Sequence, residues 1–249
     1  GSWLLGFLQG DFGTSYSYKM PVSSMLAGKL PVTGLLTGMS FVLILAFSIP
    51  LGIFTARHAG GRLDRAMTAV NQVLMAIPAF VTGILLTYVF GLVLRWFVPG
   101  NYVSPGDNFG GSLWYFLFPA VSIALPRVAM TVKMLRSSIL SELQKDYVRT
   151  SHSRGNSDRA TLYRHVLRNA MGPVVSFLAM TVADIVAGSV VIEQVFSLPG
   201  LGRMLLTSIA NRDYPVVQAV VVIVAFWVVL VNLLADLINQ RLDPRLRLT

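Results

Sequence analysis

The chain has 249 residues, of which 54% are hydrophobic and only 12% are charged, and its mean hydropathy is +0.66. These values exclude an ordinary soluble domain and predict a polytopic membrane protein. The absence of cysteine excludes a disulfide framework, a thiolate metal site and a cysteine nucleophile. The net charge of +9 is compatible with nucleic acid, anionic lipid or an acidic protein as a partner.

Five stretches are long and apolar enough to cross a bilayer as helices. In chain order they cover residues 32–56, 68–94, 113–132, 173–195 and 216–239. Four prolines lie inside or near them: Pro50, Pro78, Pro119 and Pro126. Prolines there predict kinked helices packed against protein, as in a transporter. We expect an all-α membrane domain over residues 32–239, an extracytoplasmic segment at 1–31 and a tail at 240–249.

The basic residues are unevenly divided between the two sides of these spans. Fourteen of the twenty Lys and Arg lie in residues 57–67, 133–172 and the tail, five lie in the other connections, and Arg127 lies within a span. By the positive-inside rule the larger set faces the cytoplasm, and the C-terminus with it. The membrane topology therefore explains the positive net charge, and a nucleic-acid partner is not needed to explain it. Because residues 1–31 then begin outside, we expect one more span upstream and six in the intact protein.

The longest cytoplasmic connection, residues 133–172, is predicted to form a helix, a glycine turn and a second helix. Helix-forming residues run from Leu135 to about Arg154, and Gly155 then interrupts them as a C-terminal cap would. Three N-cap candidates follow: Asn156, Ser157 and Asp158. An apolar stripe at i, i+4 and i+8 comes next: Leu162, Val166 and Ala170.

Three interpretations of this connection remain open on charge and pattern alone. It is a solvated, positively charged loop, or a helix-turn-helix that reads DNA, or a docking element whose short helix enters a groove of a cytoplasmic partner. Tethering to membrane spans at both ends argues against DNA binding. The physical pattern does not separate the first interpretation from the third.

A few polar residues lie within the spans. Asp184 lies in the middle of one span, Asp236 near the end of the last, and Arg127 follows a proline. Since a charge at mid-bilayer is costly, each is a candidate for the transport pathway or for an inter-helix contact. The three histidines do not have metal-ligand spacing, and we expect no metal site.

Two other functional classes fit the sequence less well. Asp184 and Asp236 could form the carboxylate pair of an intramembrane aspartyl protease, but neither lies in a GxGD context. A stand-alone channel or secondary transporter would need no basic docking loop. The sequence contains no GxxxxGK[ST] phosphate loop, so we expect no ATP hydrolysis, no catalytic residue and no bound cofactor in this chain.

Several segments resemble the permease subunits of ABC importers for dipeptides, oligopeptides and nickel. DYVRTSHSRG and RHVLRNAMGPVV are similar to the cytoplasmic "EAA" loop of that family, and FSLPGLGRMLLTSIANRDYPVVQ is similar to its FxWPGxG and RDYPVVQ motifs. NLLADLINQRLDPRLR and GDFGTSYSYKMPV also match family patterns, in the same order along the chain. The resemblance is to the first of the two permease subunits, which has six spans.

The resemblance implies a type I importer fold in the cytoplasmic membrane of a bacterium or archaeon. It implies a second homologous permease, two cytoplasmic ATPase subunits that hold ATP and magnesium, and an extracytoplasmic substrate-binding protein. It assigns ATPase coupling to these residues: Asp146, Tyr147, Val148, Arg149, Thr150, Ser151, Arg154, Gly155, Ser157, Asp158 and Arg159. Among them we expect Tyr147 and Val148 to be an apolar anchor and the arginines to supply charge. The implied cargo is a peptide, nickel or a nickel chelate.

Overall fold

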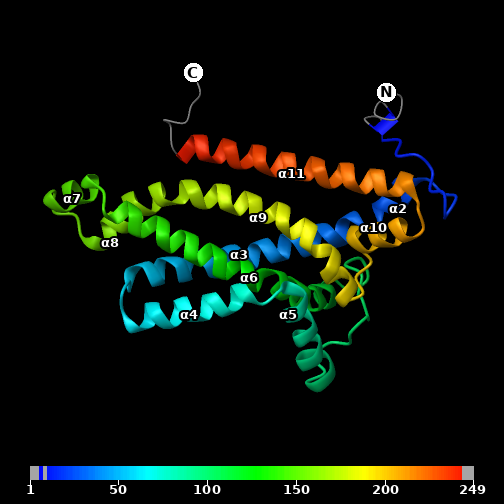
Figure 1. Ribbon diagram of the computed structural model, residues 1–249, viewed down its shortest axis with the longest axis horizontal. Helices are drawn as coiled ribbons and strands as arrows, with labels where there is room; N and C mark the ends of the chain where they lie inside the picture. The colour runs from blue at the N-terminus through cyan, green and yellow to red at the C-terminus, as the bar shows by residue number, and fades with distance from the viewer. Residues whose placement is uncertain (1–5, 8–9, 243–249) are drawn as a thin grey trace. The chain divides into compact units, whose positions relative to one another are not determined.

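The structure, a computed structural model, describes residues 6–7 and 10–242, and these are helical apart from connections and an isolated bridge between Thr14 and Pro21. The α-helices are labelled in Figure 1. In chain order they are α2 (Val22–Ala27), α3 (Leu30–Arg57), α4 (Arg62–Ala76), α5 (Ala79–Leu86), η1 (Thr87–Val93), α6 (Phe109–Leu143), α7 (Asp146–Ser153), α8 (Asp158–Thr161), η2 (Leu162–Val166), α9 (Leu167–Val195), α10 (Leu201–Ala210) and α11 (Tyr214–Leu242). The tail residues 243–249 lie outside the described part.

Four helical segments are long and apolar enough to cross a membrane, and the bent pair of α4 with α5 and η1 makes a possible fifth. This agrees with the all-α fold of about five spans that the sequence predicts. The second predicted span is not one continuous helix, because it breaks at Ile77 and Pro78. Ile77 is extended, as expected of a residue that precedes proline, and Pro78 caps α5.

The predicted helix from Leu135 to Arg154 is also divided. α6 continues without interruption to Leu143, and Lys145 is extended before α7 begins at Asp146. The prediction of a single helix was therefore wrong, and the first part of the connection is an extension of the preceding span. The short α7 is therefore a separate helix and does not continue the axis of α6.

The chain divides into two compact units. The first comprises Gly1–Phe41, Pro78–Ala124 and Ala183–Val229, and the second comprises Val42–Ile77, Leu125–Val182 and Leu230–Thr249. Each of the four long helices α3, α6, α9 and α11 contributes residues to both units. Five basic residues belong to the first unit: Lys19, Lys29, Arg95, Arg203 and Arg212. All other described Lys and Arg belong to the second, so the division of charge noted in the sequence follows the two units.

In the first unit, α2, α10 and the start of α11 share a small apolar core. Its buried members are Val22, Leu26, Leu201, Met204, Val216, Ala219 and Val220. Phe12, from the segment before α2, packs against the same core. Apolar contacts therefore hold the segment that precedes α2 and the short helix α10 together, in addition to the polar contacts described below.

A buried carboxylate fixes the beginning of α10. Glu193, near the end of α9, is fully buried, and it accepts hydrogen bonds from the Thr33 hydroxyl at 2.7 Å and from the Arg203 amide at 3.0 Å. The Thr33 oxygen in turn accepts the Leu201 amide at 2.9 Å. The first amides of a helix have no partner within the helix, so Glu193 and Thr33 act as its cap.

A second buried carboxylate, Asp213, lies just after α10 and holds the turn before α2. It accepts hydrogen bonds from the Ser15 hydroxyl and from the amides of Tyr16 at 3.0 Å and Ser17 at 3.2 Å. The Ser15 oxygen also accepts the Tyr18 amide at 2.9 Å. Asp213 therefore ties two segments that are almost two hundred residues apart in the chain.

This contact predicts a specific pH dependence. Burial alone would raise the pKa of the Asp213 carboxyl, but the hydrogen bonds from Ser15, Tyr16 and Ser17 outweigh burial and hold the pKa below its usual value. The contribution to stability is thus complete above the unfolded pKa of about 3.9 and is lost as the pH falls through the folded pKa. We expect the difference in melting temperature between wild type and Asp213→Asn to be constant at neutral pH and to shrink below about pH 4. A difference that grows on acidification would contradict this.

In the second unit, polar contacts join helices that are distant in sequence. The Arg136 guanidinium, on α6, donates two hydrogen bonds of 2.7 Å to the buried Asp64 carboxylate at the start of α4. Asp64 also accepts the Gly60 amide at 2.9 Å. The first connection of this unit is thereby fixed to α6.

Candidate functional site

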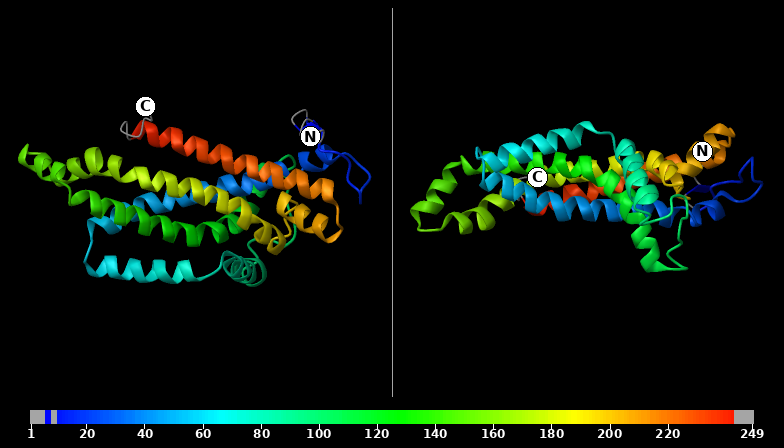
Figure 2. Two further views of the ribbon diagram at one scale, coloured as in Figure 1. Left: turned by 45° about the horizontal axis from the view of Figure 1, so that its top comes forward. Right: turned by 90° about the horizontal axis from the view of Figure 1, so that it is seen from below.

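The segment from α7 to α8 is the most clearly separated element of the second unit. It lies beyond the ends of α6 and α9, to which it is joined at either end, in Figure 1 and in both views of Figure 2. The α7–α8 segment, which lies in the connection that the sequence offers as a docking element, is therefore an exposed projection.

The turn between the two short helices has a defined backbone. α7 ends in a Schellman motif, in which the Gly155 amide donates to the His152 carbonyl at 2.9 Å and the Asn156 amide to the Ser151 carbonyl at 3.3 Å. Gly155 has φ +79°, a left-handed conformation that favours glycine. The Ser157 hydroxyl then accepts the Ala160 amide and caps α8. The predicted order of helix, glycine turn and capped helix is confirmed.

The inner side of this segment locks α7 to α8. The hydroxyls of Ser151 and Thr161, both buried, are 2.9 Å apart, and the Asn156 side-chain amide donates to Ser151 at 3.1 Å. Val148 is only 5% exposed. The two short helices and their turn are thus one stiff unit, because their contacts to each other are buried and satisfied.

Tyr147 fastens α7 to the long helices. Its hydroxyl donates to the Glu142 carboxylate of α6 at 2.8 Å and also interacts with Asn169 of α9. Burial, together with Glu142, raises the pKa of Tyr147 to about 12. Both members of the expected apolar anchor, Tyr147 and Val148, are therefore committed to contacts inside this chain. Contact of this pair with a partner stays a prediction.

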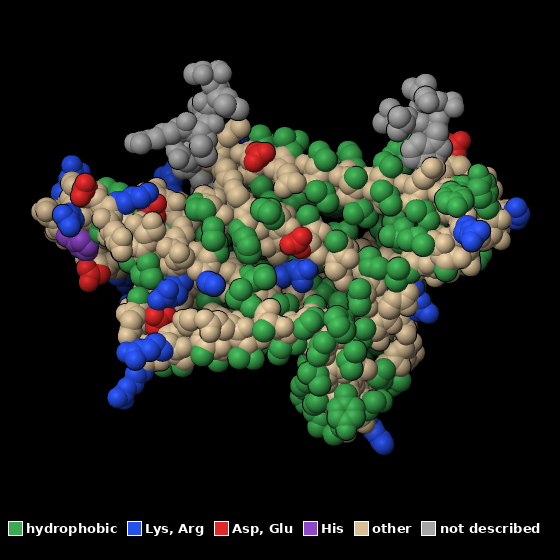
Figure 3. Space-filling view, viewed as in Figure 1, with side chains coloured by type: hydrophobic (Ala, Val, Ile, Leu, Met, Phe, Trp, Pro, Cys, Tyr) green, Lys and Arg blue, Asp and Glu red, His purple; other side chains and the backbone are tan. Residues whose placement is uncertain are grey.

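The outer side of the segment is polar and mainly basic. Its exposed residues from the predicted coupling set are Asp146, Arg149, Thr150, Arg154, Gly155, Ser157, Asp158 and Arg159. Arg164 and Arg168 are exposed nearby, whereas Leu162, Val166 and Ala170 are buried as the predicted stripe requires. Lys and Arg side chains gather over this end in Figure 3. The segment therefore presents a rigid basic surface.

The charged residues within the spans belong to different units. Asp184 lies in the first unit and is exposed, while Asp236, exposed, and Arg127, half-buried, lie in the second. Their place in a pathway stays a prediction. The sequence favours a structural role for Glu193 at the end of its span, but it does not single out the hydrogen-bonding role of Asp213. Asp213 lies within the RDYPVVQ motif, and Glu193 lies just before the FSLPG segment.

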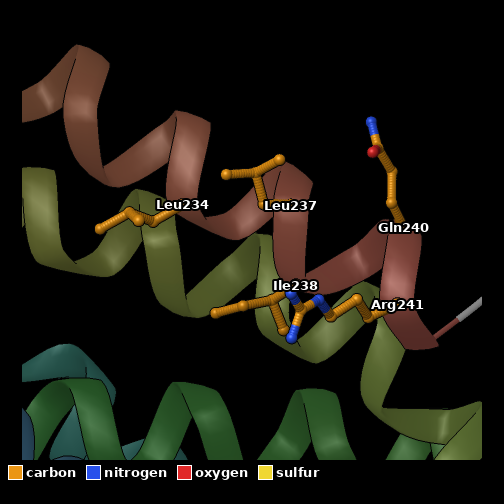
Figure 4. Close-up of a pocket in the computed structure, with 5 residues that line it drawn as sticks. All are labelled: Leu234, Leu237, Ile238, Gln240 and Arg241. Atoms are coloured by element: carbon orange, nitrogen blue, oxygen red, sulfur yellow. The ribbon is translucent and has the colours of Figure 1, made fainter.

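No group of three or more metal-binding side chains occurs among residues 6–7 and 10–242. A depression near the end of α11 is lined by Leu234, Leu237, Ile238, Gln240 and Arg241 (Figure 4). These side chains come from one helix and lie along its surface, without converging polar groups. The depression therefore offers no candidate binding site.

Comparison with known proteins gives the chain a family. Residues 48–248 match the family of binding-protein-dependent transport system inner membrane components. Oligopeptide transport system permease protein AppB of Bacillus subtilis is 37% identical over 98% of this chain and 78% of its own length. A probable peptide ABC transporter permease protein of Sinorhizobium fredii is 34% identical, with the same coverage of both chains.

The fold agrees. A chain from an inward-facing crystal structure of the MetNI methionine ABC transporter superposes with a TM-score of 0.70 at 16% identity, covering 88% of this chain and 96% of that one. A chain of an amino acid ABC transporter superposes with a TM-score of 0.60 at 15% identity, covering 87% and 93%. The chain belongs to the family of binding-protein-dependent inner-membrane transport components, as a multi-pass permease subunit of an ABC importer.

Proposed function

We propose that this permease forms half of a pathway that imports di- or oligopeptides and that it docks an ATPase subunit through the α7–α8 segment. The relatives at 34% and 37% identity are described as peptide permeases, which favours peptides over nickel. The family assignment favours this function over a stand-alone channel or a protease. ATP and magnesium would be held by two ATPase chains, and a second permease would complete the pathway.

The observation that supports docking is the rigidity and exposure of the segment. A coupling element has to transmit a push, so it must not deform when its partner moves. Here the Ser151–Thr161 contact and the Schellman turn hold α7 and α8 together, and the Tyr147–Glu142 hydrogen bond connects the segment to α6. A merely solvated loop requires none of these contacts. We place this end in the cytoplasm, with the C-terminus, because the basic residues concentrate in the second unit.

The docking partner would meet the outer side of the segment. Arg149, Arg154 and Arg159 are exposed and would face acidic or polar groups of the ATPase, while Tyr147, Val148 and Ser151 position the segment from inside. Substitutions on the two sides should therefore have different effects. Substitutions of the outer arginines should weaken docking with little loss of stability. Substitutions of the inner residues should weaken docking and also lower the stability of the permease.

The test uses the assembled importer in nanodiscs, with both permeases, the ATPases and the substrate-binding protein. The double charge reversal Arg154→Glu with Arg159→Glu should lower hydrolysis stimulated by substrate-loaded binding protein by about tenfold or more, since charge reversal at an interface opposes association. Its melting temperature should stay that of wild type, because both side chains are exposed.

Arg62→Glu is the matched control, because Arg62 is an exposed arginine of the same unit outside the segment. It should leave stimulated hydrolysis unchanged. Equal activity in the control and the double reversal would overturn the docking role. Stimulation by dipeptides or longer peptides, but not by nickel, would support the proposed cargo.

Asp184 is the strongest candidate for the pathway itself. It lies in an apolar helical segment of mean hydropathy 2.1, and it is exposed in the single chain. A carboxylate at mid-bilayer costs at least about 2.5–3.5 kcal/mol when it faces lipid. This supports an orientation of Asp184 toward the pathway or the second permease. Arg127 and Asp236 are further candidates, because each is a charged residue in an apolar helix.

A further inference from the structure

The helix α4, in the second unit, has two exposed faces of opposite character. The residues of its apolar exposed face, each at least half exposed, are Leu63, Val70 and Val73. The residues of its polar exposed face are Arg65, Thr68 and Gln72. Neighbouring members of each set are three, four or seven positions apart, so each set follows one side of the helix.

Both faces run along the same stretch of α4, so they lie at the same depth. Together with α5 and η1, α4 makes a candidate membrane span. Lipid can cover the apolar face at that depth, but a polar or charged face turned toward lipid is costly. The polar face of α4 therefore meets water or polar groups.

A second polar face lies on α6, which has neighbours on its three other sides in the second unit. Arg136 binds α4, Leu135 packs against α3, and Ser138 donates a hydrogen bond to α9. The remaining side carries Lys133 and Ser137, both exposed. The contacts of α6 therefore leave a polar side uncovered in this chain.

The ion pair between Asp64 and Arg136 brings the two polar faces to the same side. At about 100° per residue, each face lies about a quarter turn from the ion-paired residue of its own helix. α4 and α6 run in opposite directions (Figure 1), so both quarter turns lead to one side of the contact. Thr68 is four residues from Asp64 and Lys133 three residues from Arg136, which puts them at nearly the same level. We call the group formed here the basic lane, and its members are Arg65, Thr68, Lys133 and Ser137.

Nearby carboxylates do not balance the two positive charges of the basic lane. The charge of Asp64 is matched by Arg136, through two hydrogen bonds of 2.7 Å. Neither Arg65 nor Lys133 has an acidic residue three or four positions away, and in the described part of the chain neither lies within 4.0 Å of a carboxylate. The exposed Asp236 belongs to α11, which a hydrogen bond joins to α9. The lane is therefore suited to an anion.

We propose that the basic lane binds the C-terminal carboxylate of a peptide in the inner part of the pathway. The proposal rests on the proposed function, which makes peptides the cargo and places the basic residues of the second unit toward the cytoplasm. Two cations and two hydroxyl donors match the acceptor oxygens of a carboxylate. Every unmodified peptide has this group, whatever its side chains, so one site serves cargo of many sequences. Gln72, one helical turn from Thr68, offers its amide to the peptide backbone.

A lipid phosphate has similar chemistry, but the orientation of α4 argues against it. At about 100° per residue, the apolar face of α4 lies nearly opposite its polar face around the helix. If lipid covers Leu63, Val70 and Val73, the basic lane is turned away from the bilayer. A solute inside the pathway therefore fits the lane better than a headgroup.

The experiment uses the complete, nucleotide-free importer in zwitterionic nanodiscs and a tripeptide that the substrate-binding protein delivers. The tripeptide has a photoreactive C-terminal residue with a free carboxylate, and a matched form has a C-terminal amide. Mass spectrometry identifies the crosslinked segments. The free acid should crosslink to α4 and α6 about tenfold more than the amide does, because the amide offers no charge to the lane.

Arg65→Gln with Lys133→Gln should lower crosslinking of the acid by about tenfold, to the level of the amide. Arg57→Gln is the matched control, because Arg57 is an exposed arginine at the end of α3, which covers another side of α6. It should leave crosslinking unchanged. The proposal is overturned if wild type crosslinks acid and amide equally, or if the double variant crosslinks the acid as well as wild type does.

A second double variant separates binding from folding. Arg65→Lys with Lys133→Arg keeps both charges, so it should keep crosslinking within about twofold of wild type. Both double variants should melt as wild type does, because the side chains are exposed. An effect of the glutamine pair that appears only with anionic lipid assigns the lane to headgroups, and a failure of the two permeases to pair assigns it to their interface. Either result overturns the proposal.

Failure of this proposal can be told apart from failure of the proposed function. If peptide-loaded binding protein stimulates hydrolysis by the wild-type importer but the peptide does not crosslink to α4 and α6, only the lane is misassigned. If no peptide stimulates the wild-type importer, the proposed function is wrong and this inference is overturned with it.

Discussion

Replacing Gly200 with alanine is expected to lower the free energy of unfolding by about 3 kcal/mol, because it forces a buried carboxylate out of its hydrogen bonds. A Cβ on Gly200 would lie 2.4 Å from Oε1 and 2.5 Å from Oε2 of Glu193. Glu193 is fully buried, so its carboxylate has no open space to enter without losing the Thr33 hydroxyl and the Arg203 amide. The backbone of Gly200 is not the reason, since its φ of −95° suits any residue.

The measurement is the melting temperature and denaturant midpoint of the purified permease in detergent. Gly28→Ala is the control, because a Cβ there meets nothing within 4 Å and Gly28 also lies in the first unit, with φ −83°. It should be neutral or slightly stabilising. In a Glu193→Ala background, Gly200→Ala should cost much less, since the clashing group is gone. Equal costs in both backgrounds would refute the proposed clash.

Replacing Asp64 with asparagine is expected to destabilise the second unit by about 2–3 kcal/mol, because it removes one charge from a mostly buried, bidentate ion pair. Asp64 is 4% exposed, and the Arg136 guanidinium meets it through Nε and Nη2, both at 2.7 Å. Arg136→Lys should give an intermediate loss, since an ammonium keeps the charge without the two-pronged geometry. The melting temperature of the purified permease reports both.

Asp158→Asn supplies the matched control for that change. The Asp158 side chain is fully exposed, and its contact with His152 is 3.5 Å. Solvent screens such a pair, so the melting temperature should not move. An Asp64→Asn variant as stable as Asp158→Asn would show that the Arg136 contact does not stabilise the fold.

Most of the membrane architecture could be predicted without a structure. Long apolar runs indicate helices in any bilayer protein, since no other local structure satisfies the backbone there. The cap at Ser157 and the left-handed Gly155 were also predictable, because they depend on residues within one turn of helix. The break before α7 was not, because Gln144 and Lys145 are ordinary helix formers and only the contacts of Tyr147 and Val148 show why α7 departs from α6.

Composition and short sequence patterns indicate a multi-span helical protein whose basic residues concentrate in a few connections, with a glycine turn and a capped helix among them. Those features follow from composition and from patterns a few residues long. The charged groups that hold the fold are identified by the three-dimensional structure, because their partners are far away in the chain. The separation is 72 residues for Asp64 and Arg136, 160 for Thr33 and Glu193, and 198 for Ser15 and Asp213. Local periodicity carries no information about such pairs. Their burial separates carboxylates that hold the fold from exposed arginines that are available to a partner.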